Sequence, residues 1–458
     1  MKIEIQPTDE GVSKLQLIIQ PDDYEADVKK QLKKLRKQVH IPGFRPDKIP
    51  MSILQKKYGE PVKSEVISQL ITQALNDYIK ENNLEIFGQF VPLNEDQWET
   101  QLKSEAPVFE YEFAPVPEFE IPVDELKKVP LYDIEVADEA VDKYLEVQRE
   151  LNGEWQKTDQ IGDNTLLIYY ILPQDGDQAK QVRSYVSLRA VKDNDKAMEL
   201  ARRLQKEQKI EIPYGELESL FQLENRHGQW KEAHQVEADT PVIVQFEDLQ
   251  ELIPAELNEE LFEKLFPGQK IENEEALRQA IRDQIKKDYD QTAAKQYYDK
   301  LYQLLLEKTA LEVPRDFIRR LHEHTDKDQK REDLEKILDG LVKEYKFDAI
   351  LNKYFKDNNL QLTPEEIRKA AIEEAYYYLQ NNGLLQFIQT EEQLAQIADN
   401  LMEENKSFRN NVIAVARVNK FFDHLRQTLQ PEKVSIPYEE FQKITQPTLA
   451  AETTDNQN

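Results

Sequence analysis

The sequence predicts an α+β multidomain protein: an N-terminal α+β domain, a small α+β middle domain and an all-helical C-terminal domain with long helical arms. Its 458 residues suffice for about three domains. Prolines are concentrated early, with 12 of the 22 in residues 1–135. Glycine and proline are absent from residues 269–313 and 384–430. Long uninterrupted segments in a polar, amphipathic sequence are typical of long helices.

The first region, residues 1–135, mixes strand and helix patterns. Residues 14–20 and 107–116 alternate apolar and polar side chains, as strands with one buried face do. Between them lies a segment, 23–39, whose apolar residues recur at helical spacings of 4, 3 and 4: Val28, Leu32, Leu35 and Val39. Residues 61–80 repeat that pattern. We therefore expect helices and a loop inserted into an antiparallel sheet.

The middle region, residues 136–250, has strand-like runs at 164–172, 182–190 and 240–247, with one helical run at 195–208. The apolar run "LLIYYIL" at 166–172 is too short to span a bilayer and predicts a buried strand. Residues 251–445 are expected to form a helical domain. The polar, small-residue tail, 446–458, is expected to be disordered.

Composition excludes several classes of function. The net charge of −28 argues against nucleic acid binding by the whole protein, so no DNA partner is expected. The absence of cysteine excludes disulfides, thiol chemistry and cysteine metal sites. The first ten residues lack the apolar core of a signal peptide, so we expect a soluble cytoplasmic protein without a membrane partner.

Enzymatic and metal chemistry find little support. His322, Glu323, His324 and Asp326 are close in sequence, but residues two apart on a helix point in different directions. No phosphate-binding glycine loop or HExxH motif is present. We expect no metal, no cofactor and no catalytic residue.

The stretch "QVHIPGFRPDKIP" (38–50) raises a question of exposure. Rigid residues present Phe44 beside Arg45 at a tip too rich in turns to be core. Residues 28–57 carry one acidic residue, Asp47, against ten basic ones: Lys29, Lys30, Lys33, Lys34, Arg36, Lys37, Arg45, Lys48, Lys56 and Lys57. The alternatives are a solvated helix face and a turn whose Phe44 folds back onto the domain. A positive field around a Phe–Arg tip favours docking to an acidic partner.

At Gly43, Phe44, Arg45 and Pro50 the sequence resembles the docking signature G-F-R-x-G-x-x-P of the trigger factors, with Asp47 in place of the second glycine. The resemblance continues at 249–268, 358–378 and 405–422. It implies an ATP-independent chaperone that docks on the large ribosomal subunit near the exit tunnel, on ribosomal protein and rRNA, and shelters nascent polypeptides. It also implies that the free protein can form a homodimer. The residues it implies for ribosome binding are Gly43, Phe44, Arg45, Pro46, Lys48 and Pro50.

The resemblance also implies a peptidyl-prolyl isomerase domain similar to FK506-binding proteins. The pocket motif of that domain, roughly I-P-G-F-E-x-G, is not recognisable in the middle region. The nearest match is "IPYGE" (212–216), where Tyr214 and Gly215 stand in reversed order. We predict weak or absent isomerase activity. An active isomerase and a free cytoplasmic holdase remain the alternative functions.

Tyrosine is abundant in the helical region. Successive helical residues are rotated by about 100°, so Tyr376, Tyr377 and Tyr378 cannot all face one core. Tyrosine suits weak, promiscuous contacts because it joins apolar area to a polar tip. The resemblance implies client-sheltering arms here, and the candidate client contacts are Tyr297, Tyr302, Tyr376, Tyr377 and Tyr378. The alternatives are ordinary helix packing, a helical scaffold without clients, and a periplasmic chaperone, which would need a signal peptide.

Overall fold

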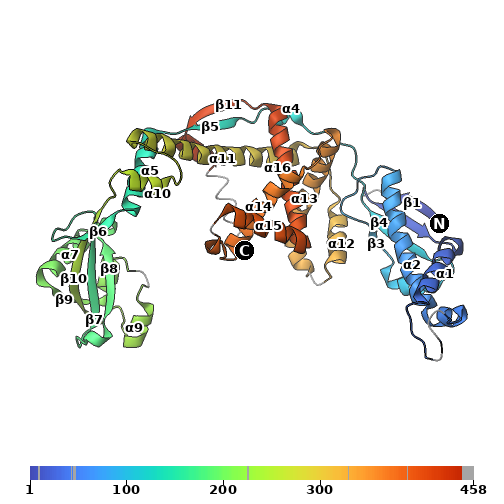
Figure 1. Cartoon of the computed structure of the whole chain (residues 1–458), viewed down its shortest axis with the longest axis horizontal. Coiled ribbons are helices and arrows are strands. Elements are labelled where there is room, and N and C mark those ends of the chain that lie inside the picture. The colour runs from blue at the N-terminus through green and yellow to red at the C-terminus, as the bar shows by residue number, and fades with distance from the viewer. Residues whose placement is uncertain are drawn as a thin grey trace. The chain divides into compact units, whose positions relative to one another are not determined.

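The computed structural model of the chain describes residues 1–8, 11–42, 44, 48–223, 226–327, 330–388 and 390–445. The predicted α+β class with a long helical region is confirmed (Figure 1). Contacts divide the chain into two compact units. The first unit joins residues 1–131 to 294–434, and the second joins residues 132–293 to the segment from residue 435 onward.

The N-terminal part of the first unit is an antiparallel sheet covered by helices. Its strands have the order β1-β2-β4-β3, with Leu15 opposite Tyr111 in the register of β2 and β4. A core of buried side chains fills the space between the sheet and its helices, with Leu17 and Phe109 fully buried. The elements are β1 (Lys2–Pro7), β2 (Ser13–Ile18), α1 (Pro21–Leu35), α2 (Met51–Glu81), β3 (Val91–Pro92), η1 (Glu95–Gln97), α3 (Trp98–Lys103), β4 (Val108–Phe113) and α4 (Val123–Leu126).

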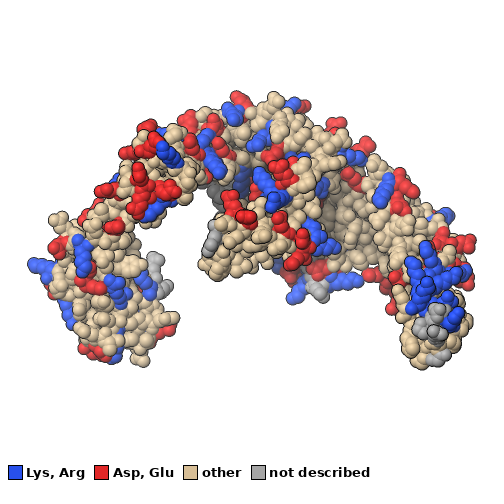
Figure 2. All heavy atoms as spheres, viewed as in Figure 1, with Lys and Arg blue, Asp and Glu red and all other residues tan. Residues whose placement is uncertain are grey.

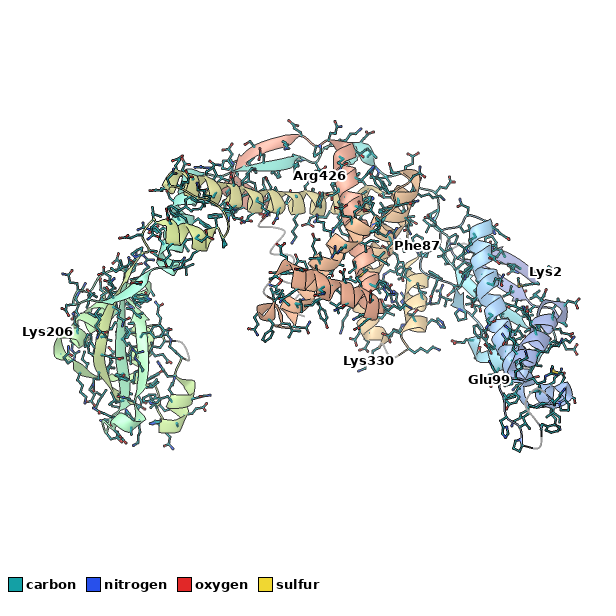
Figure 3. The ribbon with its side chains drawn as sticks, viewed as in Figure 1. Lys2, Phe87, Glu99, Lys206, Lys330 and Arg426 are labelled. Atoms are coloured by element: carbon teal, nitrogen blue, oxygen red, sulfur yellow. The ribbon has the colours of Figure 1, made fainter. Side chains whose placement is uncertain are left out.

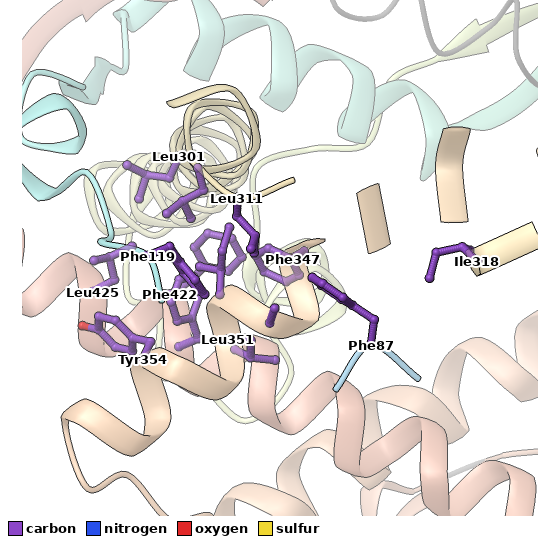
Figure 4. Close-up of a cluster of buried hydrophobic side chains, with 14 of the residues drawn as sticks. Phe87, Phe119, Leu301, Leu311, Ile318, Phe347, Leu351, Tyr354, Phe422 and Leu425 are labelled. Carbon is purple, nitrogen blue, oxygen red and sulfur yellow. The ribbon is translucent and has the colours of Figure 1, made fainter. Parts of the chain in front are cut away.

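The helical part of the first unit packs around a cluster of aromatic and aliphatic side chains (Figure 4). Phe87, labelled in Figures 3 and 4, comes from the N-terminal part and lies in the same cluster as Leu301, Phe347 and Phe422. This shared core explains why residues 1–131 and 294–434 form one unit. The elements are the later part of α11 (Glu274–Lys308), α12 (Arg315–Thr325), α13 (Arg331–Asp357), α14 (Pro364–Asn381), η3 (Leu385–Phe387), α15 (Glu391–Glu404) and α16 (Lys406–Leu429).

Helices α14, α15 and α16 form a smaller cluster that is rich in alanine, including Ala370, Ala375 and Ala398. Small side chains at these positions let the helix backbones approach closely. The start of α14 is fixed by a capping box, in which Thr363 and Glu366 satisfy each other's backbone N–H groups.

The second unit contains a twisted antiparallel sheet of order β6-β10-β7-β8, with β9 paired to β10. The predicted buried strand is confirmed, since Leu167 and Tyr169 of β7 are fully buried. The sheet elements are β6 (Glu154–Lys157), β7 (Thr165–Pro173), η2 (Gln178–Lys180), β8 (Val182–Ser187), α6 (Leu188–Val191), α7 (Asp195–Glu207), β9 (Lys209–Pro213), α8 (Tyr214–Leu220), α9 (Gly228–His234) and β10 (Pro241–Ile253).

A second cluster in this unit joins α5 (Asp138–Leu151), α10 (Glu259–Leu265) and the first part of α11 through Leu145, Leu261 and Ile281. Strands β5 (Leu131–Glu135) and β11 (Lys433–Pro437) pair with each other. The expected succession of domains, 1–135, 136–250 and 251–445, therefore differs from the grouping by contacts. Residues 251–293 pack with α5, because the apolar faces of α10 and early α11 are buried against it.

Two predictions from the sequence concern the C-terminal tail and the presence of a membrane-crossing helix. The predicted disordered tail, 446–458, lies outside the described residues. Within the described ranges, no helix combines the length and the apolar character that a membrane crossing requires.

Candidate functional site

The tip loop between α1 and α2 is held at both ends by buried isoleucines. Ile41 is 8% exposed and Ile49 is 1% exposed, and both pack in the N-terminal core. Between them Phe44 is 36% exposed, and its N–H donates to the carbonyl of Ile41 at 3.1 Å. Anchored ends with an exposed aromatic ring are the arrangement that a docking loop requires.

The structure places only part of the predicted docking set. Phe44, Lys48 and Pro50 are exposed. Gly43, Arg45 and Pro46 lie outside the described residues, as does Asp47. The role of this set in ribosome binding stays a prediction.

A basic surface flanks the loop on α1 and α2, and Figure 2 shows lysine and arginine side chains gathered over this part of the chain. Lys29 pairs with Glu25 at 2.9 Å and Lys30 lies 3.9 Å from Asp27. Six further exposed lysines make no ion pair with any residue that the structure describes: Lys33, Lys34, Lys37, Lys48, Lys56 and Lys57. We define the basic surface as the exposed residues Lys29, Lys30, Lys33, Lys34, Lys37, Lys48, Lys56 and Lys57.

Helix α1 is electrically polarised along its length. Its first turn carries Asp22 and Asp23, and its last turn carries Lys33 and Lys34. Both arrangements are stabilising, because the helix dipole favours negative charge at the N-terminus and positive charge at the C-terminus. The same arrangement brings positive charge, without an ion partner among the described residues, to the end of α1 that leads into the tip loop.

The helical region exposes a run of aromatic and apolar side chains at the end of α14 and in η3. Tyr376, Tyr377 and Tyr378 are 40%, 57% and 45% exposed, which agrees with the rotation argument from the sequence. Leu384 is 43% exposed and Phe387 is 68% exposed. We call these five residues the exposed aromatic segment. Sequence reasoning missed Leu384 and Phe387, although apolar residues just after Gly383 were a usable signal.

The other two candidate tyrosines are placed in the helical core. Tyr297 is 0% exposed, so its ring has no area to offer a client. Tyr302 is half-buried, with its ring centroid 4.9 Å from that of Phe347. Both side chains pack between helices, as the alternative of ordinary packing had it. We therefore retain only Tyr376, Tyr377 and Tyr378 as candidate client contacts.

The "IPYGE" stretch builds the turn between β9 and α8. Tyr214 is fully buried, and its hydroxyl lies 3.3 Å from Nδ1 of His227. The N–H of Gly215 donates to the carbonyl of Ala238 at 2.7 Å, and a Cβ at Gly215 would come within 2.9 Å of that oxygen. Tyr214 and Gly215 therefore have clear packing roles here. Weak or absent isomerase activity stays a prediction.

His227 should make the stability of the second unit fall in acid. Burial, helped by the neighbouring Arg226, lowers the pKa of His227 below its ordinary value of 6.5. As the pH drops below 6.5, the unfolded chain binds a proton that the folded chain does not, so the free energy of unfolding decreases. Above 6.5 both states are neutral at this group and the effect vanishes.

The measurement is the thermal midpoint between pH 5 and 8, followed through Trp230 in a Trp98→Phe/Trp155→Phe background. His227→Gln should flatten the acidic limb of the profile, while His234→Gln serves as the matched control. An unchanged acidic limb in His227→Gln would contradict the assignment.

The histidine-rich stretch of α12 has structural partners. Nε2 of His322 lies 3.3 Å from the hydroxyl of Tyr345, and Nδ1 of His324 lies 3.5 Å from a carboxylate oxygen of Glu95. Among the described residues no group of three His, Asp or Glu side chains is arranged to hold a metal ion.

Comparison with known proteins gives a consistent result. A family model described as "Bacterial trigger factor protein (TF)" matches residues 1–148, and one described as "Probable trigger factor, C-terminal domain" matches residues 293–445. The trigger factor of Hydrogenovibrio crunogenus is 24% identical over 458 residues, covering 94% of this chain and 100% of that protein. The trigger factor of Aquifex aeolicus is 25% identical over 400 residues, covering 81% and 80%.

A solved structure, from work described as "Promiscuous Substrate Recognition in Folding and Assembly Activities of the Trigger Factor Chaperone", superposes with a TM-score of 0.46 at 17% identity, covering 94% of this chain and 100% of that one. The two family models match both the region that holds the tip loop and the helical region that holds the exposed aromatic segment. This chain belongs to the trigger factor family.

Proposed function

We propose that this chaperone docks on the large ribosomal subunit through its tip loop and shelters nascent polypeptides with its helical region. The observation that carries the proposal is the anchored tip loop, whose exposed Phe44 is flanked by six lysines without an ion partner among the described residues. In a chain of net charge −28, such a concentration of positive charge needs a reason. Docking at the exit tunnel places the protein in the cytoplasm.

Docking combines an apolar and an electrostatic contribution. Phe44 loses its water when it inserts into a pocket on the partner, and an aromatic anchor of this kind can dominate an interface. Arg45, next in sequence, supplies charge-assisted hydrogen bonds to carboxylates of a ribosomal protein or to rRNA phosphates. The basic surface attracts both kinds of acidic group and speeds association. The buried Ile41 and Ile49 keep the loop presented, which reduces the entropy lost on binding.

Client binding requires no nucleotide in this proposal. The exposed aromatic segment offers several weak contacts to apolar stretches of an unfolded chain. The tyrosine hydroxyls keep the surface compatible with water when no client is bound. The client leaves when its own folding buries the stretches that these residues had contacted.

The test of docking is co-sedimentation with purified 50S subunits at low and moderate salt. We expect the Phe44→Ala/Arg45→Ala variant to bind at least about tenfold more weakly than the unmodified chain, because it loses both the aromatic anchor and the strongest hydrogen-bond donor. We also expect binding by the unmodified chain to weaken as salt rises.

A matched control is Lys206→Ala/Lys209→Ala, which removes two exposed charges from the second unit. This control should bind 50S subunits as the unmodified chain does. Equal binding by the Phe44→Ala/Arg45→Ala variant would refute docking through the tip loop. If the unmodified chain fails to bind at all, a free cytoplasmic holdase becomes the better description.

A further inference from the structure

The sheet of the second unit has an open edge at β8. This strand pairs with β7 on one side, with Tyr185 opposite Ile168, and stands last in the strand order. The carbonyl of Tyr185 accepts a hydrogen bond from the Arg226 side chain at 2.7 Å, so this carbonyl points away from β7. Because alternate residues of an antiparallel strand point the same way, Arg183 and Tyr185 both direct their N–H and C=O groups outward.

Among the residues that the structure describes, few side chains contact the outward groups of β8. The guanidinium of Arg226 lies 4.8 Å from the centre of the Tyr185 ring, in addition to its bond to the carbonyl. At the neighbouring Lys180, the carbonyl accepts from the indole N–H of Trp230 at 2.6 Å. The N–H groups of Arg183 and Tyr185 have no partner among the residues that the structure describes.

Edge strands are usually blocked by proline, by several charges or by a bulge. The sequence of β8, "VRSYVS", contains no proline and a single charge, Arg183, which is held by Glu247 at 2.7 Å. The irregularity in register lies in β10, between Phe246 and Asp248, and leaves β8 regular. Among the described residues, the side chain of Arg226 is therefore the principal cover of the middle of this edge.

We propose that the β8 edge, Val182–Ser187, accepts an extended segment of an unfolded polypeptide as an added strand, with Arg226 as a displaceable cover. An extended backbone is the ligand that satisfies outward N–H and C=O groups at strand spacing, and such binding tolerates many sequences. The Tyr185 ring, 52% exposed, offers an apolar contact to a side chain on the added strand. The inference rests on the proposed chaperone function only for the source of the segment.

The electrostatics of the edge favour a segment that carries a carboxylate beside aliphatic residues. Arg226 makes no ion pair with any residue in the described part of the chain, so a carboxylate on the incoming segment gives it a new partner once it leaves Tyr185. Release of Arg226 also frees the carbonyl of Tyr185 to accept from the backbone of the segment. Both changes occur at the same point of the strand.

The experiment uses the full chain without ribosomes and a fluorescently labelled, unstructured peptide of about eight residues, which is within the usual range of strand lengths. The peptide alternates aliphatic residues with threonine and carries one glutamate. Its affinity is measured by anisotropy. Hydrogen exchange of the β8 amides is followed in the unmodified chain with and without the peptide.

Two substitutions at one position separate the backbone from the side chain. Tyr185→Pro removes the outward N–H, which an edge strand tolerates. Tyr185→Ala removes the ring and keeps the N–H. We expect Tyr185→Pro to bind about three- to tenfold more weakly than Tyr185→Ala, and Arg226→Ala to bind a glutamate-free peptide about three- to tenfold more tightly than the unmodified chain does.

Slowed exchange at Arg183 and Tyr185 on peptide addition would support strand addition independently of any variant that folds poorly. Peptide binding without slowed exchange at these amides would overturn the inference, as would equal affinities of Tyr185→Pro and Tyr185→Ala when both retain the unmodified thermal midpoint. A Tyr376→Ser/Tyr377→Ser/Tyr378→Ser variant should leave exchange at β8 unaffected. Loss of client binding in that variant alone reports on the helical region, so the two proposals fail separately.

Discussion

Phe421→Ala should destabilise the first unit by about 3–5 kcal/mol, which is the usual cost of emptying a buried phenylalanine site. Phe421 is fully buried on α16. Its ring centroid lies 4.8 Å from that of Tyr354, 5.0 Å from that of Phe422 and 5.8 Å from that of Phe347, and these three neighbours are labelled in Figure 4. Close-packed rings from α13 and α16 surround the site, so the cavity left by the substitution should collapse only partially and most of the lost contact energy is not recovered.

The measurement is urea unfolding of the full chain in a Trp155→Phe/Trp230→Phe background. The remaining tryptophan, Trp98, packs with its ring centroid 5.5 Å from that of Phe109 and reports on the first unit. The control is Tyr377→Ala on the exposed surface of α14, for which we expect a change within about 0.5 kcal/mol. A Phe421→Ala variant as stable as this control would contradict the assignment of a shared core.

The sequence predicts a helix or a strand well where its apolar residues follow a single periodicity. The apolar positions of residues 23–39 identify α1, and alternation identifies β4; both depend on local side-chain spacing. The grouping into two units could not be predicted in this way. It depends on Phe87 and Phe119 packing against helices more than 150 residues away in sequence, and no local pattern records such contacts.

The candidate site likewise has some features that the sequence predicts and others that depend on tertiary packing. The charge density near residue 44 is a property of composition, so the basic surface could be predicted from the sequence. Helix rotation predicted that Tyr376, Tyr377 and Tyr378 could not all face one core, and the structure exposes all three. The burial of Tyr297 and the cover of β8 by Arg226 depend on which face of an element meets its neighbours. A tyrosine side chain suits a buried site such as that of Tyr297 and an exposed site such as that of Tyr377, so residue type alone does not distinguish the two.

Arg320→Ala should destabilise the first unit by about 2–4 kcal/mol, because it leaves a buried carboxylate without its partner. Glu112 of β4 is 5% exposed, and Arg320 of α12 donates to both of its oxygens, at 2.7 and 2.9 Å. The Arg320 side chain is itself 39% exposed, so the expected loss lies toward the lower end of what breaking a fully buried pair costs. Urea unfolding in the Trp155→Phe/Trp230→Phe background, followed through Trp98, measures this loss of stability.

A double variant distinguishes the orphaned charge from lost packing. If the cost of Arg320→Ala arises from the uncompensated carboxylate, Arg320→Ala/Glu112→Leu should be more stable than Arg320→Ala alone, because the buried charge is gone. If the cost arises only from lost contacts of the arginine stem, the second substitution should leave the loss in place or increase it. The sign of this difference shows whether the ion pair between β4 and α12 holds the sheet against the helices by charge or by packing.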